Sequence, residues 1–281
     1  MKIIRSINNL KKEINKIKLS NKSIGFVPTM GALHEGHLSL IRRSRRENDR
    51  VVVSIFVNPA QFGPKEDFRK YPRDLAKDSL LCRKSSVDII FCPRADQMYP
   101  QGYKTYVNVE ELSGNLCGKS RPGHFKGVAT VVAKLFNLVG PDNAYFGQKD
   151  AQQAAIIRKM VSDLNMPVNV KVESTVREKD GLAMSSRNIY LNKNERKEAL
   201  VLHQSLKLAK KLINSGIKDA KIIIRLMKQL IMAKKAARID YVYIVDLDNL
   251  ESIQRIKNKA LIAVAVWIGK TRLIDNITVY G

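Results

Sequence analysis

The stretch SIGFVPTMGALHEGHLSLI (Ser23–Ile41) joins a short apolar strand to a helix through a glycine-containing turn. Ser23–Thr29 has the apolar and β-branched composition of a buried strand, and helical spacing of apolar residues begins near Glu35. The turn between them carries two of the chain's four histidines, His34 and His37. In α/β sheets, phosphates bind where the carboxyl end of a parallel strand meets a helix N-terminus. The stretch therefore predicts an α/β fold with an anion site at this turn.

The two histidines suit charge stabilisation better than metal binding. Gly31 and Gly36 allow a ligand to approach the backbone, and an imidazole here can donate a hydrogen bond to a phosphate oxygen. Such a donor stabilises the charge that builds up in phosphoryl or nucleotidyl transfer. The alternative is a pair of surface histidines beside a helix start. A zinc site is disfavoured, because HEGH spaces its histidines three apart whereas HExxH spaces them four apart.

The chain up to about residue 174 alternates short apolar strands with longer helical segments. Further strands are predicted at Arg50–Asn58, Val87–Pro93, Asn143–Gln148 and Val168–Ser174. Helices are predicted at Glu35–Arg46, Asp74–Ser85, Gly127–Val139 and Asp150–Leu164. Tyr103–Leu112 alternates with period two and is predicted to be an edge strand or hairpin. Strand–helix alternation of this kind indicates a parallel sheet with helices on both faces.

A different pattern follows in the last third of the chain. Two amphipathic helices are predicted at residues 194–214 and 219–237, and three strands at 240–245, 260–267 and 273–280. Such a segregated order is typical of a compact α+β unit. We therefore predict two domains, residues 1–174 and residues 175–281.

The bulk composition indicates a soluble protein of a reducing compartment. Hydrophobic residues make up 44% of the 281 residues, and the apolar run Leu261–Ile268 is too short to cross a bilayer. The opening MKIIRSINNLKK lacks the apolar block of a signal peptide. The three cysteines, Cys82, Cys92 and Cys117, form no CxxC pair, which argues against a disulfide framework. We expect a cytoplasmic protein with no membrane partner.

The net charge of +24 raises the question of nucleic-acid binding. Fifty basic residues against 26 acidic ones can form an electrostatic footprint for nucleic acid. The lysines, however, are spread along the whole chain, and the only dense cluster is RRSRR at Arg42–Arg46, with no aromatic residue inside it. We favour a solvated basic surface with sites for anionic substrates, and keep nucleic-acid binding as the alternative.

Two further segments supply cations for a nucleotide site at the same sheet edge. FGQKD (Phe146–Asp150) follows a buried strand, so Lys149 can meet a phosphate and Asp150 can accept from ribose hydroxyls. A Lys-Asp pair at this position is also a common helix cap. DGLAMSSRN (Asp180–Asn188) is a polar loop whose serines and Arg187 can close over a triphosphate, although such loops are often plain linkers.

Neutral hydrogen-bonding side chains follow another strand of the predicted sheet. Asn58 and Gln61 come directly after the strand that begins at Arg50, and they suit a hydroxyl or carboxylate ligand. Gln152 and Gln153 lie one turn into the helix after FGQKD and can serve the same pocket. For any one of these amides alone, a satisfied structural role is the alternative.

Five long motifs in this order resemble the pantothenate synthetase (pantoate–β-alanine ligase) family. They are PTMGALHEGHLSLI, VNPAQFGPKEDFRKYPRD, RPGHFKGVATVVAKLFNLVGPDNAYFGQKDAQQ, IRKMVSDLNMPV and VREKDGLAMSSRNIYL. The likeness covers residues 26–191 almost without a gap and continues more weakly to the end. It implies a Rossmann-like parallel sheet of the HxGH nucleotidyltransferase type, a smaller α+β C-terminal domain acting as a lid, and a homodimer.

The resemblance also implies roles for particular residues. His34, His37, Lys149 and Arg187 would be catalytic, with His37 as proton donor. Gln61 and Gln153 would bind pantoate, Gln61 also lying near β-alanine, and Asp78 would lie near the metal. ATP would be bound by Met30, Gly31, Ala32, Leu33, His34, Glu35, Gly36, His37, Gly147, Gln148, Lys149, Asp150, Val176, Met184, Ser185, Ser186 and Arg187.

The activity implied by the family is ATP-dependent condensation of (R)-pantoate with β-alanine. Pantoyl adenylate would be the intermediate, pantothenate, AMP and pyrophosphate the products, and Mg²⁺ the metal, with no tightly bound organic cofactor. One alternative is another HxGH nucleotidyltransferase, which transfers to a phosphate and has little need of Gln61 and Gln153. The second alternative is an RNA-binding protein that uses the positive charge.

Overall fold

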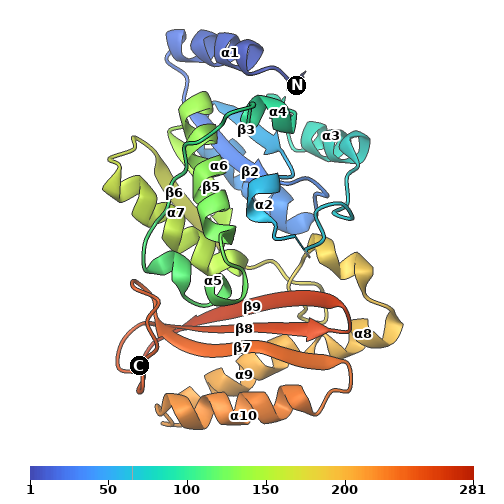
Figure 1. The fold of residues 1–281 in the computed structure, drawn as a ribbon, viewed down its shortest axis with the longest axis vertical. Helices are drawn as coiled ribbons and strands as arrows, with labels where there is room; N and C mark the ends of the chain where they lie inside the picture. Colours follow the sequence, from blue (N-terminus) through green and yellow to red (C-terminus); the bar gives the residue numbers. More distant parts are fainter. Residues whose placement is uncertain (65) are drawn as a thin grey trace.

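The computed structural model describes residues 1–64 and 66–281, and its larger part is a six-stranded sheet (Figure 1). The strand order is β1-β4-β3-β2-β5-β6, and every neighbouring pair is parallel. The strands are β1 (Lys2–Ile4), β2 (Ile24–Thr29), β3 (Arg50–Ile55), β4 (Ile89–Phe91), β5 (Asn143–Gly147) and β6 (Asn169–Glu173). The predicted α/β fold is confirmed, whereas β1 was not predicted.

Helices cover both faces of this sheet because successive strand residues point to opposite sides. Phe26 packs in one core with helices α1 (Ile7–Leu19), α6 (His124–Val139) and α7 (Ala151–Asp163). Its neighbour Val27 packs in a second core with α2 (Glu35–Glu47) and α3 (Leu75–Lys84). Since both faces are buried, the strands read as continuous apolar runs in the sequence.

The last third of the chain forms a three-stranded antiparallel sheet backed by helices. The elements are α8 (Lys193–Glu198), α9 (Val201–Asn214), α10 (Ala220–Met232), β7 (Ala237–Asp246), β8 (Ala260–Ile268) and β9 (Thr271–Val279). The single helix predicted over residues 194–214 is two helices. At the break, the N–H groups of Leu200 and Leu202 bond to the carbonyls three residues before them instead of four. Figure 1 shows this sheet lying between the six-stranded part and helices α9 and α10.

Residues of β8 alternate between two cores. Leu261, Ala263 and Ala265 belong to the core that contains Phe26. Ile262 and Val264 lie in the core formed with α9 and α10. The middle strand of the small sheet is therefore buried on both faces and joins the two parts of the molecule.

The strand predicted at Tyr103–Leu112 does not form. The chain there follows the short helix α4 (Ala95–Met98) and leads to η2 (Leu112–Gly114) and α5 (Cys117–Ser120), and no strand of the described chain lies beside it. The Thr130 side chain hydrogen-bonds both the N–H and the carbonyl of Val107, at 2.9 and 3.5 Å. A side chain of α6 thus replaces the expected ladder partner at this residue.

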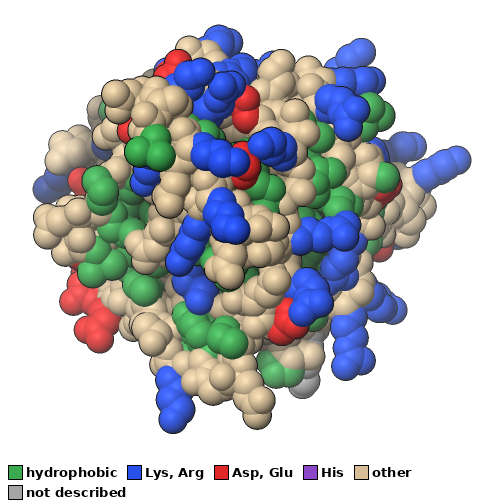
Figure 2. All heavy atoms as spheres, turned by 90° about the horizontal axis from the view of Figure 1, so that it is seen from above, with side chains coloured by type: hydrophobic (Ala, Val, Ile, Leu, Met, Phe, Trp, Pro, Cys, Tyr) green, Lys and Arg blue, Asp and Glu red, His purple; other side chains and the backbone are tan. Residues whose placement is uncertain are grey.

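The surface carries its basic residues in a dispersed arrangement. On the face shown in Figure 2, Lys and Arg side chains are spread among neutral and apolar ones, and acidic side chains are few. This matches the even spread of lysines in the sequence. In the described ranges, none of the helices has the length and apolar character needed to span a membrane.

The turns after β2, β3 and β5 meet at the carboxyl edge of the large sheet. The second of them contains η1 (Pro59–Gln61), which lies directly on helix α6. A Cβ on Gly127 would lie 2.2 Å from the Ala60 carbonyl oxygen, so only glycine permits this contact. The Gly127 carbonyl in turn accepts a hydrogen bond from Asn58 Nδ2 at 3.1 Å. Close approach of α6 therefore fixes the polar turn at the sheet edge.

We expect Gly127→Ala to lower the free energy of unfolding by about 1–3 kcal/mol, because overpacking forces the helix and turn apart. Gly114→Ala is the matched control, since a Cβ there meets no atom within 4 Å. Urea unfolding of both variants measures the difference. Equal stabilities of the two variants would show that the close contact is not needed.

Candidate functional site

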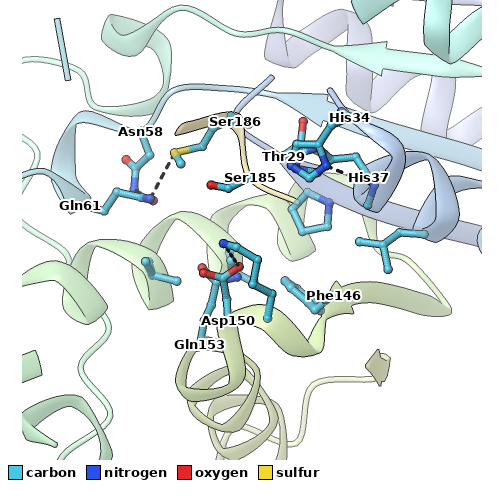
Figure 3. A pocket seen from close by; sticks show the side chains of 18 of the residues that line it. Thr29, His34, His37, Asn58, Gln61, Phe146, Asp150, Gln153, Ser185 and Ser186 are labelled. Carbon is cyan, nitrogen blue, oxygen red and sulfur yellow. Dashed lines mark hydrogen bonds and ion pairs between the residues drawn. The ribbon is translucent and has the colours of Figure 1, made fainter. Parts of the chain in front are cut away.

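A cavity of about 230 Å³ opens at the carboxyl edge of the large sheet (Figure 3). Its wall is built by the turns after β2, β3 and β5 together with the loop at residues 184–187. Fifteen residues predicted for the site line it: Met30, His34, Gly36, His37, Asn58, Gln61, Gly147, Lys149, Asp150, Gln153, Val176, Met184, Ser185, Ser186 and Arg187. The structure thus brings together segments that are far apart in the sequence.

Some residues predicted to bind ATP do not line this cavity. They are Gly31, Ala32, Leu33, Glu35 and Gln148, and Asp78, predicted near the metal, is also outside the wall. Leu33 is buried in the core with Val27, Glu35 pairs with Arg42 at the surface, and Gln148 bonds to Asn276. Any role of these residues in ATP binding stays a prediction.

His34 and His37 cap the first turn of helix α2 reciprocally. His34 Nδ1 accepts a hydrogen bond from the backbone N–H of Gly36 at 3.2 Å, and His37 Nδ1 accepts from that of His34 at 3.3 Å. The two rings lie 4.1 Å apart between centroids. Because each Nδ1 is an acceptor, each neutral ring carries its proton on Nε2. The cap therefore leaves two N–H donors available to a ligand.

The glycine between the histidines is required by the same geometry. A Cβ at Gly36 would lie 2.9 Å from Cε1 of His34 and push the ring out of its capping position. The motif HEGH thus provides two imidazoles that cap the helix, and the glycine between them leaves room for the ring of His34.

Both histidines are neutral at physiological pH. Burial, followed by the charge of Lys149, lowers the pKa of His34 from 6.5 to about 4. Burial, followed by His34 and Lys149, lowers the pKa of His37 to about 3. These imidazoles are consequently hydrogen-bond donors rather than cations in this site.

Asp78 supports the turn that carries the histidines. Its carboxylate is 1% exposed and accepts hydrogen bonds from the backbone N–H groups of Ala32, at 2.9 Å, and Leu33, at 2.8 Å. Ala32 has a φ of +49°, a conformation that non-glycine residues rarely adopt. Burial raises the pKa of Asp78, and the two N–H donors oppose that rise. The structure thus gives this carboxylate a supporting role that the sequence did not predict.

Lys149 and Asp150 lie where β5 ends, as the motif predicted. Their ammonium and carboxylate groups are 3.8 Å apart, and the Lys149 side chain is 20% exposed. Asn276 of β9 donates from Nδ2 to the carbonyls of Gln148 and Lys149, each at 2.9 Å. The small sheet therefore holds the turn that presents Lys149.

The loop after β6 reaches the histidine turn. Ser186 Oγ donates to the Ala32 carbonyl at 3.1 Å. Arg187 makes two hydrogen bonds to the Asp67 carboxylate, at 2.9 and 2.7 Å. These contacts place Arg187 at the cavity wall with its charge balanced by a carboxylate.

The two neighbouring glutamines of helix α7 have different roles. Gln152 is 5% exposed, and its amide bonds to the backbone of Cys117, Leu112 and Asn115. Gln153 lies on the cavity wall, as does Gln61. Of the pair that the sequence left open, only Gln153 faces the site.

Arg121 and His124 also line the cavity, although no role was predicted for them. His124 Nδ1 donates to the Gln61 carbonyl at 2.8 Å, and Nε2 lies 3.0 Å from an Arg121 nitrogen. Arg121 makes two hydrogen bonds to Glu66, at 2.7 and 2.6 Å. The glycine turn RPGH at a helix start was the signal available in the sequence, because Gly123 precedes His124 there as Gly36 precedes His37.

Known proteins match this chain over nearly its whole length. The sequence profile described as pantoate-beta-alanine ligase matches residues 2–278. The chain belongs to the pantoate-beta-alanine ligase family. The resemblance expected from the five motifs is thereby confirmed, and the family identifies the chain as a ligase.

Relatives in the pantoate-beta-alanine ligase family agree with this assignment. The pantothenate synthetase of Caldicellulosiruptor bescii is 55% identical over 279 residues, 99% of each chain, and that of Acetivibrio thermocellus is 56% identical over the same length and coverage. The pantothenate synthetase structure from Thermus thermophilus has a TM-score of 0.95 at 45% identity over 100% of both chains. The Francisella tularensis pantoate-beta-alanine ligase, solved with beta-gamma ATP and beta-alanine, has a TM-score of 0.82 at 35% identity, covering 99% of this chain and 97% of that one.

Three neutral histidines of the site make the fold sensitive to acid. The pKa values of His34 and His124 are about 4 and that of His37 about 3, whereas an unperturbed histidine titrates near 6.5. Between these limits only the unfolded chain binds the protons, so stability is full above pH 6.5 and falls as the pH falls toward 4. Each histidine contributes a slope of up to about 1.4 kcal/mol per pH unit.

We expect His37→Gln to show a shallower loss of stability between pH 6.5 and pH 4.5 than the unaltered chain. Urea unfolding at several pH values measures both slopes, and the other acid-sensitive groups are common to the two proteins. Identical slopes would mean that His37 is not buried as a neutral ring.

Proposed function

We propose that this chain condenses pantoate with β-alanine at the expense of ATP, through a pantoyl adenylate, giving pantothenate, AMP and pyrophosphate. The observation that carries the proposal is one cavity wall that holds the Nε2–H donors of His34 and His37, the Lys149 ammonium and the Gln61 and Gln153 amides. The family match and the ligand-bound Francisella relative support it. It is favoured over the other HxGH nucleotidyltransferases, whose phosphate acceptors do not need the two glutamines.

In the first step, a pantoate carboxylate oxygen attacks the α-phosphorus of ATP, and the bond to the bridging oxygen of pyrophosphate breaks. Negative charge grows on the phosphate oxygens as this happens. His34 and His37 donate hydrogen bonds to these oxygens as neutral rings, and Lys149 and Arg187 add positive charge. We assign His37 to hydrogen-bond donation from Nε2–H, since burial lowers the pKa of its imidazolium form to about 3 and the ring is therefore neutral at neutral pH.

In the second step, the amine of β-alanine attacks the acyl carbon of the adenylate, and AMP leaves with the electron pair of the carbon–oxygen bond. The amine loses a proton to solvent or to the departing phosphate. Arg121, next to His124 and Gln61, is positioned to pair with the β-alanine carboxylate in place of Glu66. The adenylate must be protected from water, and the loop at residues 184–187, which forms part of the cavity wall, helps to exclude water.

Mg²⁺ fits this site as a companion of the nucleotide. The described residues contain no cluster of three or more His, Cys, Asp or Glu side chains able to hold a metal alone. Mg²⁺ commonly binds phosphate oxygens and waters with only one or two carboxylates. Asp150 offers a half-exposed carboxylate at the cavity, whereas Asp78, predicted near the metal, is buried outside the cavity wall and accepts hydrogen bonds from Ala32 and Leu33. Bound there, the ion would neutralise phosphate charge.

The experiment that tests this function uses the purified chain with ATP, Mg²⁺ and D-pantoate, with and without β-alanine. We expect pantoate-dependent exchange of pyrophosphate into ATP without β-alanine, and AMP with pantothenate when β-alanine is added. Absence of pantoate-dependent exchange and of AMP would refute the proposed reaction.

We expect His37→Ala to lower the rate of adenylate formation by about two to three powers of ten, the usual effect of losing a charge-stabilising donor. Pyrophosphate exchange measures this rate. His203→Ala is the control, because His203 lies outside the cavity and its Nδ1 has no hydrogen-bond partner in the described chain. Near-normal exchange in the His37 variant would remove His37 from the mechanism.

We further propose two domains, residues 1–174 and 175–281, a cytoplasmic location and a homodimer. The dimer is supported by the family resemblance and by the surface segment at residues 103–109, which has no partner strand in the described chain. The side chain of Tyr106 in this segment is 48% exposed. A surface segment without a partner strand can pair with another chain through those backbone groups that are not already bonded, as Val107 is to Thr130.

We expect the unaltered chain to sediment with twice the mass of one chain, and Tyr106→Asp to sediment as a monomer, because a buried charge opposes the contact. Tyr280→Asp, at a residue that is 69% exposed, is the control. A dimer that survives in the Tyr106 variant would place the interface elsewhere.

A further inference from the structure

The amide of Gln61 has two possible orientations, and they bind opposite kinds of ligand atom. With Nε2 toward the cavity it donates to a carboxylate or hydroxyl oxygen, whereas with Oε1 toward the cavity it would repel a carboxylate. In the structure Oε1 accepts from Asn58 Nδ2 at 3.0 Å, and Nε2 lies 3.2 Å from the Met30 sulfur (Figure 3). One Nε2 hydrogen points to this thioether, which is a weak acceptor. The second Nε2 hydrogen is available to an organic acid.

The orientation of Gln61 depends on that of Asn58, which is 1% exposed. Asn58 Oδ1 accepts from the Tyr99 hydroxyl at 2.8 Å and from the Ala60 N–H at 3.3 Å. Its Nδ2 is thereby turned toward Gln61 and the Gly127 carbonyl. Of the two donors to Oδ1, the tyrosine makes the shorter and stronger contact.

Tyr99 is held in place away from the cavity. It ends helix α4, does not line the cavity, and its ring packs against Phe56 and Tyr103 with centroid distances of 6.5 and 5.1 Å. Burial raises the pKa of its hydroxyl, which is therefore protonated and able to donate. The hydroxyl of Tyr99 is linked to the site through Asn58, whereas its ring packs against Phe56, which lines the cavity.

We infer that Tyr99 is a positioning residue for the organic acid, acting through Asn58 to keep the Gln61 N–H group turned into the cavity. The inference rests on the proposed function, in which Gln61 binds pantoate. Without the phenolic donor, Asn58 keeps only the longer Ala60 contact on its oxygen. A rotated Asn58 amide would set its oxygen against Gln61 Oε1 and drive the glutamine amide to rotate as well.

The test compares Tyr99→Phe with Tyr103→Phe, which removes a hydroxyl from the adjacent ring that does not contact Asn58. We expect Tyr99→Phe to raise the KM for pantoate about three- to tenfold, the range of a neutral hydrogen bond, with the KM for ATP unchanged. Tyr103→Phe should leave both KM values as they are. Loss of folded protein alone would instead lower kcat at constant KM.

A double-mutant cycle with Gln61→Ala decides whether Tyr99 acts through the glutamine. In the Gln61→Ala background, Tyr99→Phe should cause no further rise in the KM for pantoate. An unchanged KM in the single variant, or the same rise in both backgrounds, would overturn the inference while leaving the reaction in place. Failure of the unaltered chain to use pantoate would overturn the proposed function and this inference with it.

Discussion

The reciprocal cap between His34 and His37 is the interaction on which the site depends. It satisfies two backbone N–H groups at the start of α2 and, by the same bonds, puts both ring protons on Nε2. A single pair of contacts thus ends the turn, begins the helix and prepares two donors for an anionic ligand. Asp78 of α3 accepts hydrogen bonds from the backbone of this turn, so the position of the two histidines depends on α3 as well as on α2.

The arginines at the cavity wall are balanced by carboxylates. The chain carries a net charge of +24, yet Arg121 and Arg187 at the cavity wall each bind a carboxylate from the loop after η1. Burying a guanidinium without a partner is costly, and Glu66 and Asp67 supply that partner for these two arginines.

Local patterns in the sequence were sufficient for much of the fold and for half of the site. Apolar runs ending in glycine turns identified β2 and β5, and the motif HEGH identified His34 and His37. The three residues of β1 were too few to show a pattern. The apolar residues that alternate at residues 103–112 pack against the core that contains α6 and form no strand pair. The pairing of Arg121 with Glu66 and that of Asp78 with the histidine turn join positions distant in sequence. No local pattern indicates these partners, although RPGH marks a turn at Arg121 itself.

The double burial of β8 has a consequence for motion during turnover. Rotation of the whole small sheet away from the large one would expose Leu261, Ala263 and Ala265, and the free-energy cost grows with the apolar area brought into water. The loop bearing Ser186 and Arg187 contacts Ala32 and Asp67 of the large-sheet part through hydrogen bonds, which water or substrate can replace. Rearrangement of that short segment therefore costs less free energy than rotation of the whole small sheet, and loop motions are in general faster than domain motions.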